Sequence, residues 1–308
     1  MKWKPRKKSS GDVIDIRGAE GSGGRSGGLG GLPLPGGAIG GIGGTAGVVI
    51  ALVIIGIQVF GGGSVAGFDV GQVLGPGSTP PGADNPDPLP PEQDPQREFF
   101  EFSEYVFDDT QKTWRSSFAG SEGGYEDAKL VVYDDAVSTG GCGNATSAVG
   151  PFYCPADSRV YLDLTFYEDM ERQLGGGGDF AWAYVIAHEM GHHIQNVLGT
   201  NDRVARLEQD DPDSANELSV RIELQADCYA GVWAATVFAE GDLESGDLDE
   251  AFDTAEAIGD DRLQEQAGQS VNPDSFTHGS SEQRREWFER GYSSGDPSDC
   301  DTFTPESV

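Results

Sequence analysis

The stretch between Gly18 and Gly47 most constrains what this chain can fold into, because 15 of its 30 residues are glycine. Glycine loses more backbone freedom on folding than any other residue, and it brings no side chain that could offset this loss by packing. Residues 61–97 hold eight prolines among Gly, Ser and Asp, a composition typical of an extended, semi-rigid spacer. We therefore expect a disordered tail over 1–45 and a folded domain confined to 98–304.

An apolar segment, Ala46–Phe60, lies between these two regions and contains one polar residue, Gln58. Its 15 residues are few for a bilayer span, but uncharged flanks extend it towards the ~20 that a spanning helix needs. A buried core helix is a weaker interpretation, because the flanking Gly and Pro tracts offer no core. Small residues at 64–66 would suit a cleaved signal peptide, but 45 residues precede the segment, far more than a signal peptide carries there. We therefore predict an uncleaved transmembrane anchor over 46–66 and a flexible linker over 67–97.

Charge is distributed unequally along the chain. It has 20 Lys and Arg against 52 Asp and Glu, a formal net charge of −32. So acidic a protein does not suit binding to phosphates through a basic face, and we expect no nucleic-acid partner. Seven of the basic residues nevertheless lie within residues 1–25, and the positive-inside rule would keep that end in the cytoplasm. We therefore expect a single-pass protein of the cell membrane whose folded domain is extracytoplasmic.

The cysteines agree with that location. All four follow the predicted anchor, and none is spaced as CxxC, which argues against a zinc ribbon and against thioredoxin chemistry. Two disulfides suit an oxidising compartment instead. Four cysteines allow three pairings, and the sequence does not decide among them. The most local pairing joins Cys142 to Cys154 and Cys228 to Cys300.

The domain has a pattern that predicts a mainly helical α+β fold with a small sheet. Segments rich in β-branched and aromatic residues predict strands at 129–133 and 159–166. The expected helices are 98–114, 180–198 with Asp179 as N-cap, a long helix from 215 and a Ser-capped helix over 281–291.

One motif in this domain points to chemistry. Residues 188–192 read HEMGH, an HExxH pattern within a predicted helix, and a chain with four histidines contains it by chance only rarely. Spacing of four residues puts His188 and His192 on one helical face, where both imidazoles can bind one metal ion while Glu189 reaches a water that the metal activates. We therefore predict that His188 and His192 bind zinc. His193 points about 100° away from His192 and is expected behind the ligands or at the surface.

A catalytic zinc usually has three protein ligands, so a third is expected elsewhere. In the helix predicted from residue 215, Glu223 and Asp227 lie four residues apart and face one side. Ala230, Gly231 and Ala234 continue that stripe and would let this helix approach the HExxH helix closely. A solvated acidic face is the alternative, but apolar residues surround the pair. We assign Glu223 as the third zinc ligand and Asp227 as the acceptor that orients a zinc-bound histidine.

Six runs of sequence are more specific than HExxH alone. They are GPFYCPAD (150–157), VYLDLTFYEDM (160–170), GDFAWAYVIAHEMGHHIQ (178–195), ELQADCYAGVW (223–233), AIGDDRLQ (257–264) and DSFTHGSSEQR (274–284). With these runs the chain resembles the neutral zinc metallopeptidase family of bacterial membrane-associated proteins over roughly residues 98–304. The resemblance implies a zincin-like domain, one zinc ion and peptidase activity, and the ExxxD element of glutamate-zincins supports Glu223 and Asp227. It also implies that the strand at 159–166 is an upper edge strand that pairs with an extended peptide substrate.

Together these observations predict a zinc-dependent endopeptidase that hydrolyses peptide bonds with a metal-activated water and Glu189 as general base. The developing oxyanion needs a further donor. His278, the only histidine outside the HExxH helix, is the candidate, and Tyr161, Tyr229 and Tyr292 are its competitors. The alternative function is a membrane-tethered, non-catalytic zinc-binding or scaffold protein. A structural zinc usually has four protein ligands, often cysteines, whereas the cysteines here are spaced for disulfides.

Overall fold

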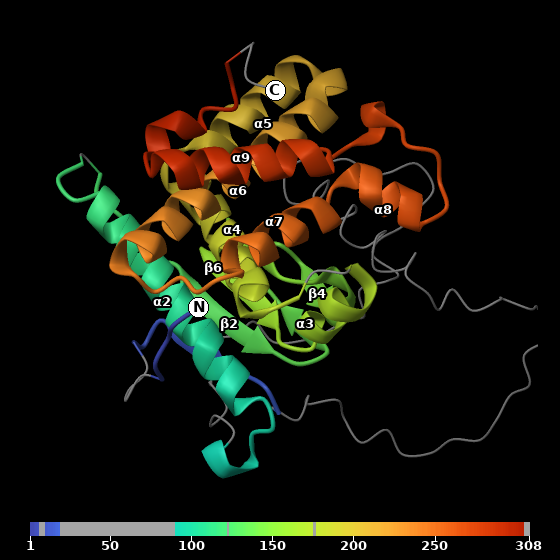
Figure 1. Cartoon of the computed structure of the whole chain (residues 1–308). Coiled ribbons are helices and arrows are strands. Elements are labelled where there is room, and N and C mark those ends of the chain that lie inside the picture. The colour runs from blue at the N-terminus through green and yellow to red at the C-terminus, as the bar shows by residue number, and fades with distance from the viewer. Residues whose placement is uncertain (6–9, 19–89, 122, 175–176, 305–308) are drawn as a thin grey trace, which may run out of the picture.

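The computed structural model describes residues 1–5, 10–18, 90–121, 123–174 and 177–304, which form a mainly helical α+β domain with a small sheet (Figure 1). The α-helices are α2 (Arg97–Ser117), α3 (Phe166–Asp169), α4 (Asp179–Val197), α5 (Thr200–Asp210), α6 (Ala215–Glu240), α7 (Asp247–Ala257), α8 (Asp260–Gln266) and α9 (Ser281–Ser294). The strands are β1 (Val13–Asp15), β2 (Lys129–Tyr133), β3 (Ala136–Ser138), β4 (Asn144–Thr146), β5 (Phe152–Cys154) and β6 (Arg159–Asp163). Short helical turns are η2 (Pro91–Gln93), η3 (Ser147–Val149), η4 (Met170–Leu174), η5 (Pro212–Ser214), η6 (Pro273–Ser275) and η7 (Pro297–Cys300).

The helix that carries HExxH begins differently from the prediction. Asp179 is its first helical residue, and Gly178, with φ at 106°, takes the N-cap position. Glu250 of α7 instead satisfies one of the free N-terminal donors, since its Oε2 accepts from the backbone N–H of Phe180 at 2.9 Å. A side chain at Gly178 would collide with that carboxylate, because a Cβ there would lie 2.1 Å from it. A contact between distant segments therefore caps α4.

Within the described residues, four strands form the main sheet in the order β1-β2-β6-β5. β1, β2 and β6 are parallel, and β5 runs antiparallel to β6, with Phe152 opposite Tyr161. The prediction of an edge strand at 159–166 is therefore wrong, because β6 has a neighbour on each side and β5 is the end strand. The strand also stops at Asp163, whose Oδ1 accepts from the backbone N–H of Thr165 at 2.9 Å and turns the chain into α3.

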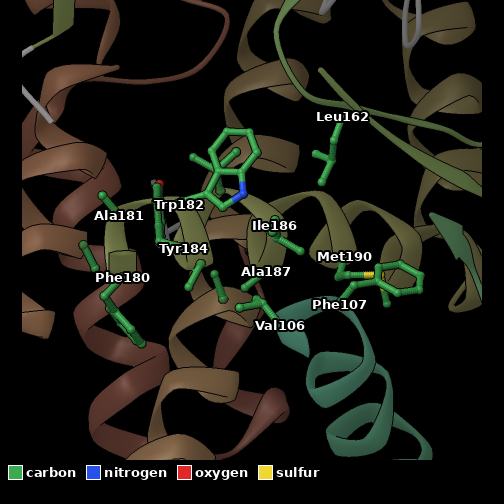
Figure 2. Close-up of a cluster of buried hydrophobic side chains, with 14 of the residues drawn as sticks. Val106, Phe107, Leu162, Phe180, Ala181, Trp182, Tyr184, Ile186, Ala187 and Met190 are labelled. Carbon is green, nitrogen blue, oxygen red and sulfur yellow. The ribbon is translucent and has the colours of Figure 1, made fainter. Parts of the chain in front are cut away.

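Helix α4 lies at the centre of the domain. It contacts α2, α6 and α7 and also β5 and β6. Figure 1 shows α5, α6 and α9 towards one end of the molecule and the strands β2 and β6 towards the other, with α4 between them. All residues from Phe180 to Gln195 are buried, which is typical of a core helix. Figure 2 shows the apolar cluster around this helix, with Val106 and Phe107 of α2 and Leu162 of β6. The packing gives the polar residues of α4 a rigid base.

The two disulfides follow the most local of the three pairings. Cys142–Cys154 joins the segment after β3 to the last residue of β5, and Cys228–Cys300 joins α6 to η7. All four cysteines are therefore paired. The second bridge fixes the C-terminal segment against α6, one residue beyond Asp227.

Helices α6 and α9 contact each other through backbone atoms. A Cβ on Gly291 would lie 1.9 Å from the carbonyl oxygen of Cys228, and one on Gly231 would lie 2.1 Å from that of Phe288. Neither position therefore admits a side chain. Gly231 was expected to face the HExxH helix; this prediction is wrong, because Gly231 lies on the side of α6 that packs against α9.

We expect the Gly291→Ala substitution to lower the free energy of unfolding by about 3 kcal/mol, the upper end of typical overpacking costs. The added methyl group has to push α9 away from α6. Ser293→Ala, exposed on the same helix, is the control and should change stability by less than about 0.5 kcal/mol. Urea unfolding followed by circular dichroism measures both variants, and unchanged stability of Gly291→Ala would contradict the close helix contact.

Residues 1–5 and 10–18 correct the prediction of a disordered tail over 1–45. β1 is a strand of the main sheet and pairs with β2. Arg17 is 2% exposed, and its Nη2 lies 2.8 Å from a carboxylate oxygen of Asp94, just before α2. Because Arg17 is buried, this ion pair can form only when residues 10–18 are folded against the domain. These residues are part of the domain and not a separate tail.

This packing bears on the predicted membrane topology. A tail and a domain on opposite sides of a membrane would separate residues 10–18 from the strand and the ion pair that they contact. The predicted anchor over 46–66 and most of the linker over 67–97 lie outside the described residues. Within the part that the structure describes, no helix is long and apolar enough to cross a membrane.

Candidate metal centre

Helices α4 and α6 bring together the three residues that the sequence predicts as zinc ligands. His188 and His192 lie one turn apart on α4, with ring centroids 4.8 Å apart. Glu223 of α6 faces them: its Oε2 is 3.1 Å from His188 Nε2, and its Oε1 is 3.5 Å from His192 Nε2. The donor atoms of these residues all lie within 4.8 Å of one another. This spacing allows them to bind one metal ion.

Each histidine directs its Nε2 at Glu223 because another side chain holds its Nδ1. Asp227 Oδ1 lies 2.7 Å from His188 Nδ1, and Gln195 Oε1 lies 2.9 Å from His192 Nδ1. Gln195 in turn donates to a backbone carbonyl of α6 at 2.6 Å. Because the Nδ1 of each histidine faces an acceptor, its Nε2 is the atom that can bind a metal ion, with loss of any proton that it carries.

A close contact between α4 and α6 sets this geometry. Gly191 is the second variable residue of HExxH, and a Cβ there would lie 2.9 Å from both Cα and the carbonyl oxygen of Ala226. Glycine at this position lets the two helix backbones meet. Glu223, almost one turn before Ala226, then reaches the two histidines.

The charges at the centre act on one another. Burial raises the pKa of Glu223, but the nearby His192 and His188 outweigh this effect and hold the pKa well below its usual range. Burial lowers the pKa of His188, but Asp227 and Glu223 outweigh it and raise the pKa to about 10. The centre thus combines basic nitrogens with an ionised carboxylate, a donor set that suits a divalent cation such as zinc.

His188, His192 and Glu223 line a cavity, and Glu189 lines it too and is 8% exposed. Burial raises its pKa above the usual value, although His192 and His188 act in the opposite direction. The backbone of Tyr153 in β5 also acts to lower this pKa. A buried carboxylate with a raised pKa is suited to accept and return a proton.

His278 enters this cavity from the segment between η6 and α9. Asp260, the first residue of α8, fixes that segment: its Oδ2 accepts from the backbone N–H groups of Thr277 and His278, both at 2.6 Å. Its Oδ1 lies 3.3 Å from His278 Nδ1. Burial lowers the pKa of His278, but Asp260 and the charge of Glu223 outweigh it and raise the pKa.

The three tyrosines predicted as competitors of His278 are not among the residues that line the cavity. The hydroxyl of Tyr161 donates to Asp157 at 2.7 Å. Tyr229 and Tyr292 each pack against an aromatic ring elsewhere. Among the four candidates, the structure brings only His278 to the site.

Besides Gln195, two residues that sequence reasoning missed lie behind the ligands. Tyr184, one turn before His188 on α4, donates to Asp227 Oδ1 at 2.6 Å. Arg284 of α9 also contacts Asp227, with Nε 2.8 Å from Oδ2 and Nη2 3.0 Å from Oδ1. The four-residue spacing of Tyr184 and His188 could have indicated the first. No local spacing connects Arg284 with α6.

His193 was expected behind the ligands or at the surface. It is 1% exposed, and its hydrogen-bond partners lie away from the metal centre. Its Nε2 lies 2.7 Å from the carbonyl oxygen of Glu126, and its Nδ1 lies 3.0 Å from the hydroxyl of Tyr153. Tyr153 belongs to β5. His193 therefore ties α4 to the end strand of the sheet.

The cavity has a polar part and an apolar part. The polar part holds the metal group, Glu189 and His278. A site with an apolar surface and a few converging polar groups is typical of ligand binding. The apolar part is lined by Val149, Phe166, Met170, Val185, Ile258 and Leu263.

The sequence also matches a known family. The model of the family described as "Putative neutral zinc metallopeptidase" covers residues 1–303 of this chain. The chain belongs to this family. The match starts at residue 1, so it extends the resemblance expected over 98–304 to the N-terminal residues that pack against the domain. A zinc peptidase family implies zinc for the group of His188, His192 and Glu223 and suggests peptidase activity.

Relatives of this chain are found in Escherichia coli and Mycobacterium tuberculosis. The uncharacterized protein YpfJ of Escherichia coli (strain K12) is 44% identical over 304 residues, which cover 98% of this chain and 99% of YpfJ. The uncharacterized protein Rv2575 of Mycobacterium tuberculosis (strain ATCC 25618 / H37Rv) is 46% identical over 192 residues, which cover 59% of this chain and 64% of Rv2575. No solved structure matches the chain significantly.

Proposed function

We propose that this protein is a zinc-dependent endopeptidase that hydrolyses peptide bonds. The observation that carries this proposal is the group of His188, His192 and Glu223, which shares one cavity with Glu189. Three metal donors beside a buried carboxylate form the set that metal-assisted hydrolysis requires. The family supports the same reaction class.

The donor set fits zinc. Zinc binds imidazole nitrogen and carboxylate oxygen, and its catalytic sites combine three protein ligands with an open position. His188 and His192 meet the further requirement that a second side chain orients each ligating imidazole. When bound, zinc supplies Lewis-acid polarisation of the scissile carbonyl and lowers the pKa of water.

We assign Glu189 the role of general base. It accepts the proton of the attacking water and returns it to the leaving amine. Burial raises the pKa of Glu189, which brings its proton affinity closer to that needed near neutral pH.

His278 is proposed as the donor to the developing oxyanion. Asp260 faces its Nδ1, and the raised pKa of His278 favours the imidazolium, whose Nε2–H can donate to substrate. The same carboxylate holds the backbone on either side of the imidazole, so the donor is fixed before substrate binds. Preorganised donors of this kind contribute strongly to acyl transfer.

We propose that an extended peptide substrate pairs with β5. This strand ends the order β1-β2-β6-β5, so within the described residues one of its edges has no strand partner. Phe152 and Tyr153 of β5 line the cavity, and a peptide along this edge would pass Glu189. Addition of a strand to a sheet edge is a common mode of peptide recognition.

The alternative, a membrane-tethered, non-catalytic zinc-binding or scaffold protein, agrees less well with these residues. Structural zinc sites are usually closed by four protein ligands. The group of His188, His192 and Glu223 has three, and all four cysteines are in disulfides. A structural site would also have no use for Glu189.

Cleavage of an unstructured peptide library by the zinc-loaded full chain tests the proposal, with mass spectrometry as the readout. We expect internal peptide bonds to be cut, cleavage to stop with a zinc chelator, and cleavage to return when zinc is added back. A protein that is fully loaded with zinc and cuts no peptide would contradict the endopeptidase function and favour the scaffold alternative.

We also propose that this is a cell-membrane protein whose domain lies outside the cytoplasm. The two disulfides support an oxidising compartment, and the segment 46–66 is the proposed anchor. Residues 10–18 pack against the domain, and a single membrane crossing at 46–66 would separate the two. We therefore propose that 46–66 attaches the chain to the membrane without a single-pass crossing, so that both parts lie on the same side.

Cysteine labelling tests this topology in intact cells. Ser10→Cys and Asp213→Cys place thiols at exposed positions of the N-terminal segment and of the domain. We expect a membrane-impermeant maleimide to label both variants without permeabilisation. Labelling of Asp213→Cys alone would contradict the shared compartment, and labelling of neither would contradict the location outside the cytoplasm.

A further inference from the structure

We propose that Arg284 is a positioning residue of the zinc centre, which fixes Asp227 and, through Asp227, the orientation of His188. This inference rests on the proposed zinc centre. It adds α9, the helix of Arg284, to the two helices that carry the metal ligands. Three helices then build the centre. Helix α4 carries the two histidines, α6 carries Glu223 and Asp227, and α9 carries the arginine that holds Asp227 in place.

The side chain of Asp227 is surrounded by donors. It is 0% exposed, and its Oδ1 accepts from the hydroxyl of Tyr184 at 2.6 Å, from His188 Nδ1 at 2.7 Å and from Arg284 Nη2 at 3.0 Å. Its Oδ2 accepts from Arg284 Nε at 2.8 Å. Among the described residues, Arg284 is the one partner that engages both oxygens, so it sets the plane of the carboxylate.

The guanidinium of Arg284 decides how the carboxylate of Asp227 is held. A guanidinium has donors only, and its planar fork matches both carboxylate oxygens. Asp227 beside Arg284 therefore remains an acceptor. His188 must then donate from Nδ1, and its Nε2 remains directed at the metal position.

The contact of α6 with α9 brings Arg284 to this place. Asp227 lies one turn before Gly231, and Arg284 lies two turns before Gly291, the two glycines at which the helix backbones meet. A longer distance between the helices would withdraw the guanidinium from the carboxylate. The Nη1 of Arg284 also donates to the carbonyl oxygen of Ile258 at 3.3 Å, which fixes the fork from its other side.

A purely structural role is the competing explanation, since a buried ion pair also holds α9 against α6. The two explanations differ in whether substitutions of Arg284 and Asp227 affect zinc affinity independently. If Arg284 acts through Asp227, its removal has no further effect on zinc binding once Asp227 can no longer orient His188. If Arg284 only stabilises the fold, the two effects on zinc affinity multiply.

A double-mutant cycle on zinc affinity tests the proposal, measured for the full chain by competition with a chromophoric chelator. The variants are Arg284→Met, Arg284→Lys, Asp227→Asn and the double variant Asp227→Asn/Arg284→Met. Arg285→Met is the matched control, because Arg285 is next in sequence and pairs with Glu256 at the surface, away from the metal centre. Circular dichroism of each zinc-free protein establishes that it is folded.

We expect Arg284→Met to weaken zinc binding by about 10–100-fold, the usual effect of removing a group behind a metal ligand, and Arg284→Lys to restore part of the loss. Arg285→Met should bind zinc like the unmutated chain, and the double variant should match Asp227→Asn within about twofold. Unchanged zinc affinity of Arg284→Met, or losses that multiply in the double variant, would overturn the proposal.

Folding and function are kept apart in this test. If Arg284→Met does not fold, Arg284→Lys decides, because it keeps the charge but loses the two-point contact. Zinc affinity of Arg284→Lys equal to that of the unmutated chain would then overturn the proposal. Failure of the zinc centre itself gives a different result, since the unmutated chain would not bind zinc at all.

Discussion

We expect the Glu223→Ala protein to bind zinc far more weakly than the unmutated protein. The substitution leaves two imidazoles for the metal and removes the only anion in the group of three donors. Zinc affinity should therefore fall by more than the roughly 10–100-fold typical of residues behind the ligands. Equilibrium competition with a chromophoric chelator measures the change directly.

Glu217→Ala is the matched control for this variant. Glu217 lies on the same helix, is exposed and accepts from the buried Arg221, which also donates to the backbone carbonyls of Thr302 and Thr304, so removal of Glu217 should leave zinc affinity unchanged. The same zinc content and affinity in Glu223→Ala and in the unmutated protein would show that the third ligand is another residue.

The sequence predicts the parts of the centre that lie within one helix. The spacing of His188 and His192 requires only that α4 is helical, and a buried apolar segment ensures this. The spacing of Glu223 and Asp227 puts both carboxylates on one face of α6 for the same reason. These four residues meet in the structure as the patterns indicate.

The parts that join different helices were not predictable from local patterns. Gln195 orients His192, yet the spacing of three residues also occurs between residues that do not interact. Asp260 and Arg284 reach the site from α8 and α9, and their positions depend on how these helices pack. A helix pattern reports which face is buried, but it does not report which neighbour covers that face.

The strands show the same limit. β1 contains three residues, too few for an alternating pattern, and it follows a basic segment typical of a tail. The longer, more apolar run at 159–163 became the interior strand β6, while the three residues of β5 took the edge beside α4. Strand order is a property of pairing between distant segments, so composition alone assigns it poorly.

The second large effect concerns Glu189. Glu189→Gln keeps the size and polarity of the side chain but cannot accept a proton at neutral pH. We expect kcat for peptide cleavage to fall by about 10²–10⁴-fold, the contribution of general acid–base catalysis. Zinc should remain bound, because Glu189 is not one of the three donors. Glu217→Gln, an exposed position, is the control for the substitution itself.

The most direct test of this account measures zinc content and peptide cleavage in the same sample of the Glu189→Gln protein. The account predicts one zinc per chain, as in the unmutated protein, together with the loss of peptide cleavage. Undiminished cleavage by a zinc-loaded Glu189→Gln protein would contradict it.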